Sequence, residues 1–130
     1  MRVAISVITP ERDAVLDTRF GRAKAFVVMD TETNEWQGYA NPAVGATGGA
    51  GVEAAEFIVE KDAEAAISGA FGPNAYDVLS AANIGMYQAE TGTATELVQK
   101  LKDGALEPVK SYSVRGGRRG GGGRRRGRGR

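Results

Sequence analysis

The sequence has neither cysteine nor histidine among its 130 residues. Without cysteine no disulfide framework can form, and thiols place no constraint on the redox compartment. These two residues are also the commonest side-chain ligands of transition metals, so a zinc or iron site built on them is excluded. Catalytic triads and acid–base pairs that depend on histidine are excluded as well. We therefore expect no tightly bound transition metal in the protein as isolated.

Long apolar runs are missing too. No stretch approaches the roughly 20 apolar residues of a membrane-spanning helix. The apolar start of the chain is interrupted by Pro10 and is too short for a signal peptide. We therefore expect a cytoplasmic protein that makes no contact with membranes.

The first predicted strand, residues 2–8, holds no carboxylate, although a two-metal nuclease needs several carboxylates converging on that strand. The protein is thus predicted not to be an enzyme.

Acidic and aromatic residues are absent from the last part of the chain. Residues 115–130 consist of eight arginines and eight glycines, with a charge of +8, whereas residues 1–114 have nine basic and sixteen acidic residues and a charge of −7. Residues 115–130 have no apolar group to offset the entropy of ordering and are expected to be disordered. The chain is therefore divided into a domain over residues 1–110 and a disordered tail over residues 111–130.

Two interpretations of this tail remain open. Segments rich in arginine and glycine bind RNA or single strands, so Arg115–Arg130 is a candidate for binding RNA or another polyanion. No aromatic residue follows Tyr112, so base stacking is excluded and such binding would be indifferent to sequence. Alternatively, the tail is solubilising or folds back on the acidic body.

The first 40 residues carry three strand patterns. Residues 2–8 form a β-branched run typical of a central strand, and residues 9–19 are polar and irregular, which indicates a loop. Residues 25–29 and 36–40 predict two further strands. The turn-forming cluster Asp30–Glu35 between them indicates a hairpin.

The rest of the chain alternates helices and strands. A helix is predicted over residues 51–61, with Val52, Ala55, Ile58 and Val59 buried and Glu53, Glu56 and Glu60 on a solvated stripe. A strand at Ala65–Ile67 leads through a glycine turn to a helix that begins at Pro73. The predicted buried face of that helix comprises Ala75, Val78, Leu79 and Ala82.

A short fifth strand is predicted over residues 84–88. Thr93 and Glu96 have the spacing of a capping box for a last helix, and Gly104 stands where such a helix ends. The order is β-β-β-α-β-α-β-α, in which βα units imply parallel strands and the hairpin adds antiparallel ones. The sequence therefore predicts an α/β fold with a five-stranded mixed sheet.

Two glycine-rich loops precede helices, and both are expected at one edge of the sheet. The first contains Thr47, Gly48, Gly49 and Gly51, and the second contains Gly72 and Asn74. One interpretation is an anion cradle formed by free helix N–H groups and the positive end of the helix dipole. The other is a pair of flexible turns that let helix pack on sheet. The loops lack the Gly-Lys-Ser or Gly-Lys-Thr of a phosphate-binding P-loop.

Arg22 and Asn74 also allow two interpretations each. Arg22 follows Phe20 and Gly21 in a loop, where its guanidinium is suited to a bidentate contact with an anion or to a surface salt bridge. The Asn74 amide suits either a ligand or a hydrogen bond within its own turn.

Five stretches resemble one family in register over residues 1–110: Arg2-Val-Ala-Ile-Ser-Val, Phe20-Gly-Arg-Ala23, Asn41-Pro42, Gly49-Ala-Gly-Val-Glu-Ala-Ala55 and Gly72-Pro-Asn-Ala75. They are similar to the nitrogenase iron–molybdenum cofactor carrier family, of the NifX and NafY type, which also forms the C-terminal domain of NifB.

The resemblance implies a ribonuclease-H-like three-layer fold, together with a small non-catalytic domain that carries an iron–molybdenum or other metal–sulfur cofactor between assembly proteins. Because three glycine-containing turns are expected at one end of the sheet, the candidate binding residues are Phe20, Gly21, Arg22, Thr47, Gly48, Gly49, Gly51, Gly72 and Asn74. Arg19 and Gly48 stand at or beside positions where many members have histidine, so no soft side-chain ligand for iron is present.

Overall fold

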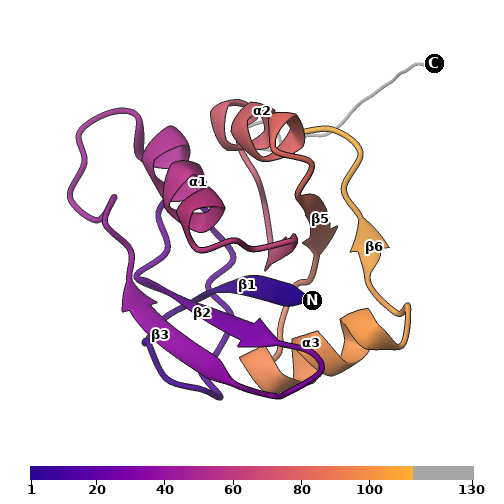
Figure 1. The fold of residues 1–130 in the computed structure, drawn as a ribbon. Coiled ribbons are helices and arrows are strands. Elements are labelled where there is room, and N and C mark those ends of the chain that lie inside the picture. The colour runs from indigo at the N-terminus through magenta and orange to yellow at the C-terminus, as the bar shows by residue number, and fades with distance from the viewer. Residues whose placement is uncertain (113–130) are drawn as a thin grey trace.

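The computed structural model describes residues 1–112, which form a six-stranded sheet and three helices (Figure 1). The strands are β1 (Arg2–Val7), β2 (Ala25–Asp30), β3 (Trp36–Ala40), β4 (Ala65–Ser68), β5 (Gly85–Gln88) and β6 (Glu107–Pro108). The helices are α1 (Ala50–Glu60), α2 (Pro73–Ala81) and α3 (Ala94–Lys102). The predictions of tail disorder and of polyanion binding by Arg115–Arg130 concern residues outside the described part of the chain.

The strand order is β3-β2-β1-β4-β5-β6. Strands β1, β4 and β5 are mutually parallel, while β1–β2, β2–β3 and β5–β6 are antiparallel pairs. The predicted hairpin and the mixed α/β sheet are therefore confirmed. The run of small and β-branched residues in β1 is explained by its central place, where both faces are covered.

The predicted five strands were one too few. Pro108, which follows the end of α3, lies in β6, and this strand pairs with the edge of β5. Proline lacks an N–H and is tolerated on an edge strand, where that side of the backbone needs no partner. The Val109 N–H also donates to the Met86 carbonyl oxygen at 2.8 Å. Two paired residues leave no periodic pattern, so the strand is invisible in the sequence.

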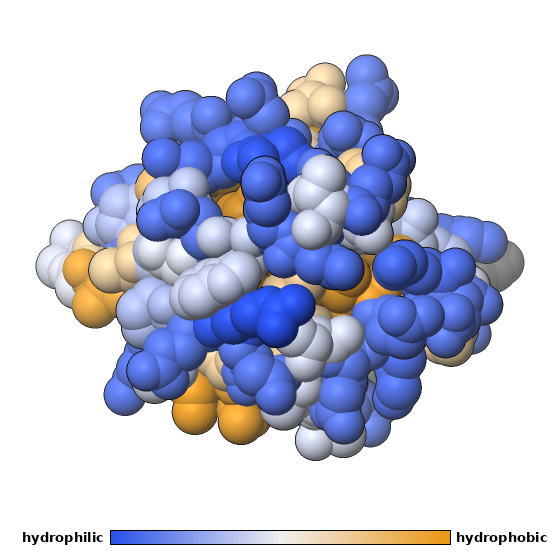
Figure 2. Space-filling view, turned by 60° about the horizontal axis from the view of Figure 1, so that its bottom comes forward, coloured by the Kyte–Doolittle hydropathy of each residue, from blue (hydrophilic) through white to orange (hydrophobic). Residues whose placement is uncertain are grey.

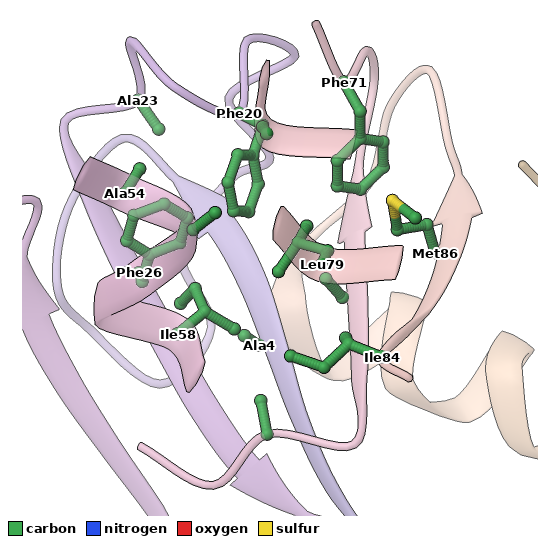
Figure 3. Packing of buried hydrophobic residues seen from close by; sticks show 14 of the residues in the cluster. Ala4, Phe20, Ala23, Phe26, Ala54, Ile58, Phe71, Leu79, Ile84 and Met86 are labelled. Atoms are coloured by element: carbon green, nitrogen blue, oxygen red, sulfur yellow. The ribbon is translucent and has the colours of Figure 1, made fainter. Parts of the chain in front are cut away.

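Helices cover both faces of the sheet, α1 and α2 on one side and α3 on the other (Figure 1). Successive residues of β1 accordingly enter two different cores. Ala4 packs under α1 and α2 with Phe26, whereas Val3 and Ile5 pack with the face that α3 covers. Figure 3 shows the first core, where Phe20, Phe71, Leu79 and Ile58 point toward one another.

The helix ends follow their local signals. Pro73 occupies the first turn of α2. Thr93 and Glu96 form the predicted capping box of α3, with the Thr93 N–H donating to Glu96 Oε1 at 3.0 Å. Gly104 has φ 73° immediately after α3, a conformation that glycine adopts without strain. None of the helices in residues 1–112 is long and apolar enough to cross a membrane.

Two predicted core residues are in fact exposed. Val59 has an exposed fraction of 37%, and Ala82 is exposed as well. Both line a groove between α1 and α2 instead of facing the sheet. The groove arises because two helices that lie side by side on a sheet diverge on their outer surfaces. Figure 2 shows the underside of the molecule as drawn in Figure 1, where mainly hydrophilic side chains are exposed and the apolar ones form small separate groups.

Candidate functional site

One edge of the sheet gathers all the loops in question. Strand β3 runs parallel to β1, because each of them pairs antiparallel with β2. Strand β4 pairs parallel with β1, and β5 pairs parallel with β4. The carboxyl ends of these four strands therefore share one edge. Loops 8–24, 41–49 and 69–72 begin at this edge, and the latter two lead into the N-termini of α1 and α2. Crevices beyond the carboxyl ends of strands are the usual ligand sites of open α/β sheets.

Phe20 anchors the first of these loops in the core. Its side chain is 1% exposed, and its ring lies 5.2 Å from that of Phe26 and 5.1 Å from that of Phe71, centroid to centroid. Figure 3 shows it pointing inward between the sheet and the two helices. The Phe20 side chain is thus enclosed in the core, and a binding role for this residue stays a prediction. Its place in the core positions the residues that follow.

Gly21 brings the first loop into backbone contact with α1. A Cβ on Gly21 would lie 2.9 Å from the Gly51 Cα, closer than real Cβ atoms approach other carbon atoms. Gly51 in turn adjoins α2, since a Cβ there would lie 3.5 Å from the Ala75 nitrogen. The start of α1, the start of α2 and the Gly21 loop therefore meet at one point, and the absence of side chains allows it.

Both helices begin without a side-chain cap. Gly49, at φ 73°, caps α1 and Gly72, in extended conformation, caps α2, and neither has a side-chain hydrogen bond to the first turn. The first bond within α1 runs from the Glu53 N–H to the Gly49 carbonyl at 3.0 Å, which leaves the preceding N–H groups of its first turn without intrahelical acceptors. In α3, by contrast, the Thr93 hydroxyl already accepts from the Glu96 N–H.

Arg22 and Asn41 stabilise the loops around these helix starts. Arg22 is exposed, and its Nη1 donates to the Ala46 carbonyl at 2.8 Å, next to Thr47. The buried Asn41 amide donates to the carbonyls of Gly21 at 3.3 Å and Ala23 at 2.8 Å. The sequence reasoning missed this role for Asn41. Asn41 had been noted only as part of the Asn41-Pro42 stretch that resembles the family, and no role had been assigned to its side chain.

The predicted site residues thus fall into two groups. Gly21 and Gly51 are in direct contact, and Gly72 and Asn74 are linked to them through Ala75. Thr47, Gly48 and Gly49 are exposed on the loop before α1, and a side chain on Gly48 or Gly49 would meet nothing within 4 Å. Asn74 is exposed, and among residues 1–112 its side chain makes no hydrogen bond. The predicted alternative of a turn bond for its amide is therefore not observed.

A buried polar cluster beneath the edge was not anticipated. Ser6 at the end of β1 and Ser68 at the end of β4 are both fully buried, and their hydroxyl oxygens lie 2.8 Å apart. The Ser6 hydroxyl also donates to the Asp17 carbonyl at 2.7 Å, and the Asp17 N–H donates to the Ser6 carbonyl at 2.9 Å. These bonds fasten residues 9–19, predicted as an irregular loop, to the sheet.

The same loop is fastened to α3 by a carboxylate. The Thr95 hydroxyl donates to Asp13 Oδ1. This bond, followed by one with Thr93, lowers the pKa of the Asp13 carboxyl from its ordinary value of 3.8. No group of three or more carboxylates in the described chain is arranged to hold a metal ion.

Most of the chain is similar to proteins of one known family. The family described as "Dinitrogenase iron-molybdenum cofactor" matches residues 1–104. The apo form of the orange protein from Desulfovibrio gigas is 32% identical, with a TM-score of 0.83 over 87% of this chain and 96% of that one. A Thermotoga protein assigned as NifB is 30% identical, with a TM-score of 0.77 over 88% of this chain and 97% of that one.

A curated but uncharacterised protein of Methanocaldococcus jannaschii is 30% identical over 95 residues, which are 71% of this chain and 80% of that protein. The family match spans every described helix and strand except β6 and includes the three loops at the carboxyl edge. The chain belongs to the dinitrogenase iron-molybdenum cofactor family.

Proposed function

We propose that the protein is a non-catalytic carrier that holds an anionic metal–sulfur cofactor, or its precursor, at the carboxyl edge of the sheet. The observation that carries this proposal is the meeting of the α1 and α2 starts beside Gly21, where glycine caps both helices and no side chain of residues 1–112 accepts from their first-turn N–H groups. Two converging helix N-termini favour an anion through both hydrogen bonds and dipoles. Family membership makes the iron–molybdenum cofactor the first cargo to test.

The cargo would be held without a bond from a side chain to a metal. The chain offers no thiolate or imidazole, so backbone N–H groups and the Arg22 guanidinium are the groups suited to the sulfide surface of a cluster. Arg22 is exposed and needs only to exchange the Ala46 carbonyl for the anion. Release of such a cargo breaks hydrogen bonds alone, which suits transfer between assembly proteins.

Three further aspects rest on the same proposal. The partners would be the cofactor-assembly proteins that deliver and receive the cargo. The absence of catalysis is supported by the chain's lack of histidine and by the lack of carboxylates on β1. The fold relation to ribonuclease-H-like proteins is supported by three antiparallel strands followed by βα units, in the order β3-β2-β1-β4-β5.

An anaerobic titration with extracted iron–molybdenum cofactor tests the site. Backbone N–H signals of Gly21, residues 47–52 and residues 72–75 should shift in ¹H–¹⁵N spectra. Arg22→Gln should weaken binding by about ten- to a hundredfold, because a charged hydrogen bond contributes roughly 1.5–3 kcal/mol. The matched variant Arg12→Gln removes an exposed charge from loop 9–19 and should bind like the parent.

The outcomes separate the rival interpretations. Shifts confined to other surfaces would show that the site is placed wrongly. No shift anywhere, with the spectrum of the folded protein intact, would favour a scaffold protein without a small ligand. Equal weakening by Arg12→Gln and Arg22→Gln would mean that only the net charge matters and would remove Arg22 from the site.

A further inference from the structure

The groove between α1 and α2 combines an apolar floor with an acidic rim. It has a volume of about 550 Å³ and is lined by Val59, Val78, Ala81 and Ala82 together with Glu56 and Glu60. It lies on the outer side of the two helices, because their inward residues Ile58 and Leu79 are fully buried against the sheet. It is therefore separate from the candidate anion site at the helix N-termini.

The acidic rim has no cation from the described part of the chain. Ion pairs within residues 1–112 join the N-terminus to Glu32 and Arg19 to Asp17, so neither Glu56 nor Glu60 is paired there. Lys61, next in sequence to Glu60, is turned elsewhere. Its Nζ lies 4.5 Å from the ring centre of Tyr39 and 5.2 Å from that of Phe57.

We propose that the arginine–glycine segment, residues 115–130, docks in this groove of its own chain. The segment carries a charge of +8, and the groove presents two carboxylates that no cation of residues 1–112 pairs, on a body of charge −7. Arginine suits such a surface, because its aliphatic stem packs on apolar side chains while its guanidinium forms bidentate bonds to carboxylates. The interspersed glycines allow the backbone to lie close over the alanines of the floor.

The described chain ends beside α2, on the face of the helix opposite to that of Val78, Ala81 and Ala82, so the segment would have to pass around the helix to reach the groove. The Tyr76 hydroxyl on α2 donates to the Lys110 carbonyl at 2.8 Å, and the ring of Tyr112 lies 6.3 Å from that of Tyr76. The last described residues thus lie against α2, which is one wall of the groove. The 18 residues that follow span up to roughly 60 Å when extended. The distance along α2 from Tyr76 to Ala81 is only about 8 Å.

A spin label on the segment tests the docking in the full chain. The protein has no cysteine, so Gly129→Cys introduces a single thiol for a nitroxide. Amide signals of Val59, Ala81 and Ala82 should broaden, and NaCl at about 0.5 M should reverse the broadening by screening exposed charges. The double variant Glu56→Gln and Glu60→Gln should reduce it at least twofold. The matched double variant Glu11→Gln and Glu90→Gln alters two exposed carboxylates elsewhere and should leave it unchanged.

Three results would overturn the proposal. Broadening absent from the groove would mean that the segment lies elsewhere or contacts another partner. Equal effects of the two double variants would show that the attraction depends on the net charge of the body and not on the groove. Broadening in a mixture of ¹⁵N-labelled chains without nitroxide and unlabelled chains with it would show that a second copy supplies the segment.

Discussion

At the scale of single residues, backbone contacts that only glycine allows hold the candidate site together. Gly21 touches the backbone of Gly51, and Gly69 approaches Thr18 so closely that a Cβ would lie 2.6 Å from the Thr18 Cβ. The loop that carries Arg22 therefore lies directly against α1 and against the turn before α2. Side chains at these glycines would separate the three loops, so the residue type is dictated by space and not by torsion angles.

Gly21→Ala should therefore lower the free energy of unfolding by about 1–3 kcal/mol, the usual cost of overpacking. It should also weaken cofactor binding, since Arg22 would move with the loop. Gly48→Ala is the matched control, because a Cβ there meets nothing within 4 Å, and its effect should stay within about 0.5 kcal/mol. Denaturant unfolding measures both, and equal losses would contradict the contact.

The Asp13 carboxyl predicts how the stability of the fold depends on pH. Its pKa is lowered, first by the Thr95 hydroxyl and then by Thr93, so the folded state binds the proton less readily than the unfolded one. The stabilisation is present above the ordinary pKa of 3.8 and is lost as the pH falls through the lowered value. Thr95→Val should raise the Asp13 pKa toward 3.8, as followed by NMR of its side-chain carbon.

Thr91→Val is the control for that titration, because Thr91 is exposed and makes no hydrogen bond to Asp13 among the described residues. An Asp13 pKa that is the same in the Thr95→Val variant and the parent would show that another group lowers it.

At the scale of elements, the three helices differ in how their N-termini are used. The start of α3 is closed by its own capping box, while α1 and α2 start at glycines that cap with no side chain. Capping by a side chain typically stabilises a helix, so its absence at two neighbouring helix starts leaves donors for something else. This contrast within one molecule supports the proposed anion site at the starts of α1 and α2.

The variant Gly72→Asp tests the role of the uncapped α2 start. Gly72 has an extended backbone and open space around it, so aspartate fits and its carboxylate can accept from the first turn of α2. The gain in unfolding free energy should be a few tenths of a kcal/mol to about 1 kcal/mol. Cofactor binding should fall, because the new carboxylate occupies the same N–H groups and repels the anion.

Gly72→Asn serves as the control, since its amide caps without a charge and should weaken binding less than aspartate does. Undiminished cofactor binding by the Gly72→Asp variant, measured in the same anaerobic titration, would exclude the α2 start from the site.

At the scale of the whole molecule, the absence of cysteine and histidine restricts how metal can be bound. The described chain has no cluster of carboxylates suited to a metal ion, and carboxylates alone favour harder cations than iron or zinc. Purified, tag-free protein mixed with Zn²⁺ or Fe²⁺ and then desalted should retain far less than one equivalent per chain. Elemental analysis measures this, and a stoichiometric amount after desalting would contradict it.

Much of the architecture was determined by the sequence itself. The order of helices and strands up to α3, the start of α2 at Pro73, the capping box at Thr93 and the glycine after α3 are confirmed. Each depends on residues within a few positions of one another, so the signal is local and survives in one dimension. The lack of soft metal ligands is likewise a property of composition.

Tertiary structure decided the features that join distant segments. Strand order and register, which no local pattern encodes, determine three such features. These are the contact of Gly21 with Gly51, the hydrogen bond from Ser6 to Asp17 and the pairing of β6 with β5. Phe20 and Val59 show the same limit. Apolar character indicates burial only on average, and the place of each side chain was set by which elements packed beside it: Phe20 lies in the core and Val59 lines an exposed groove.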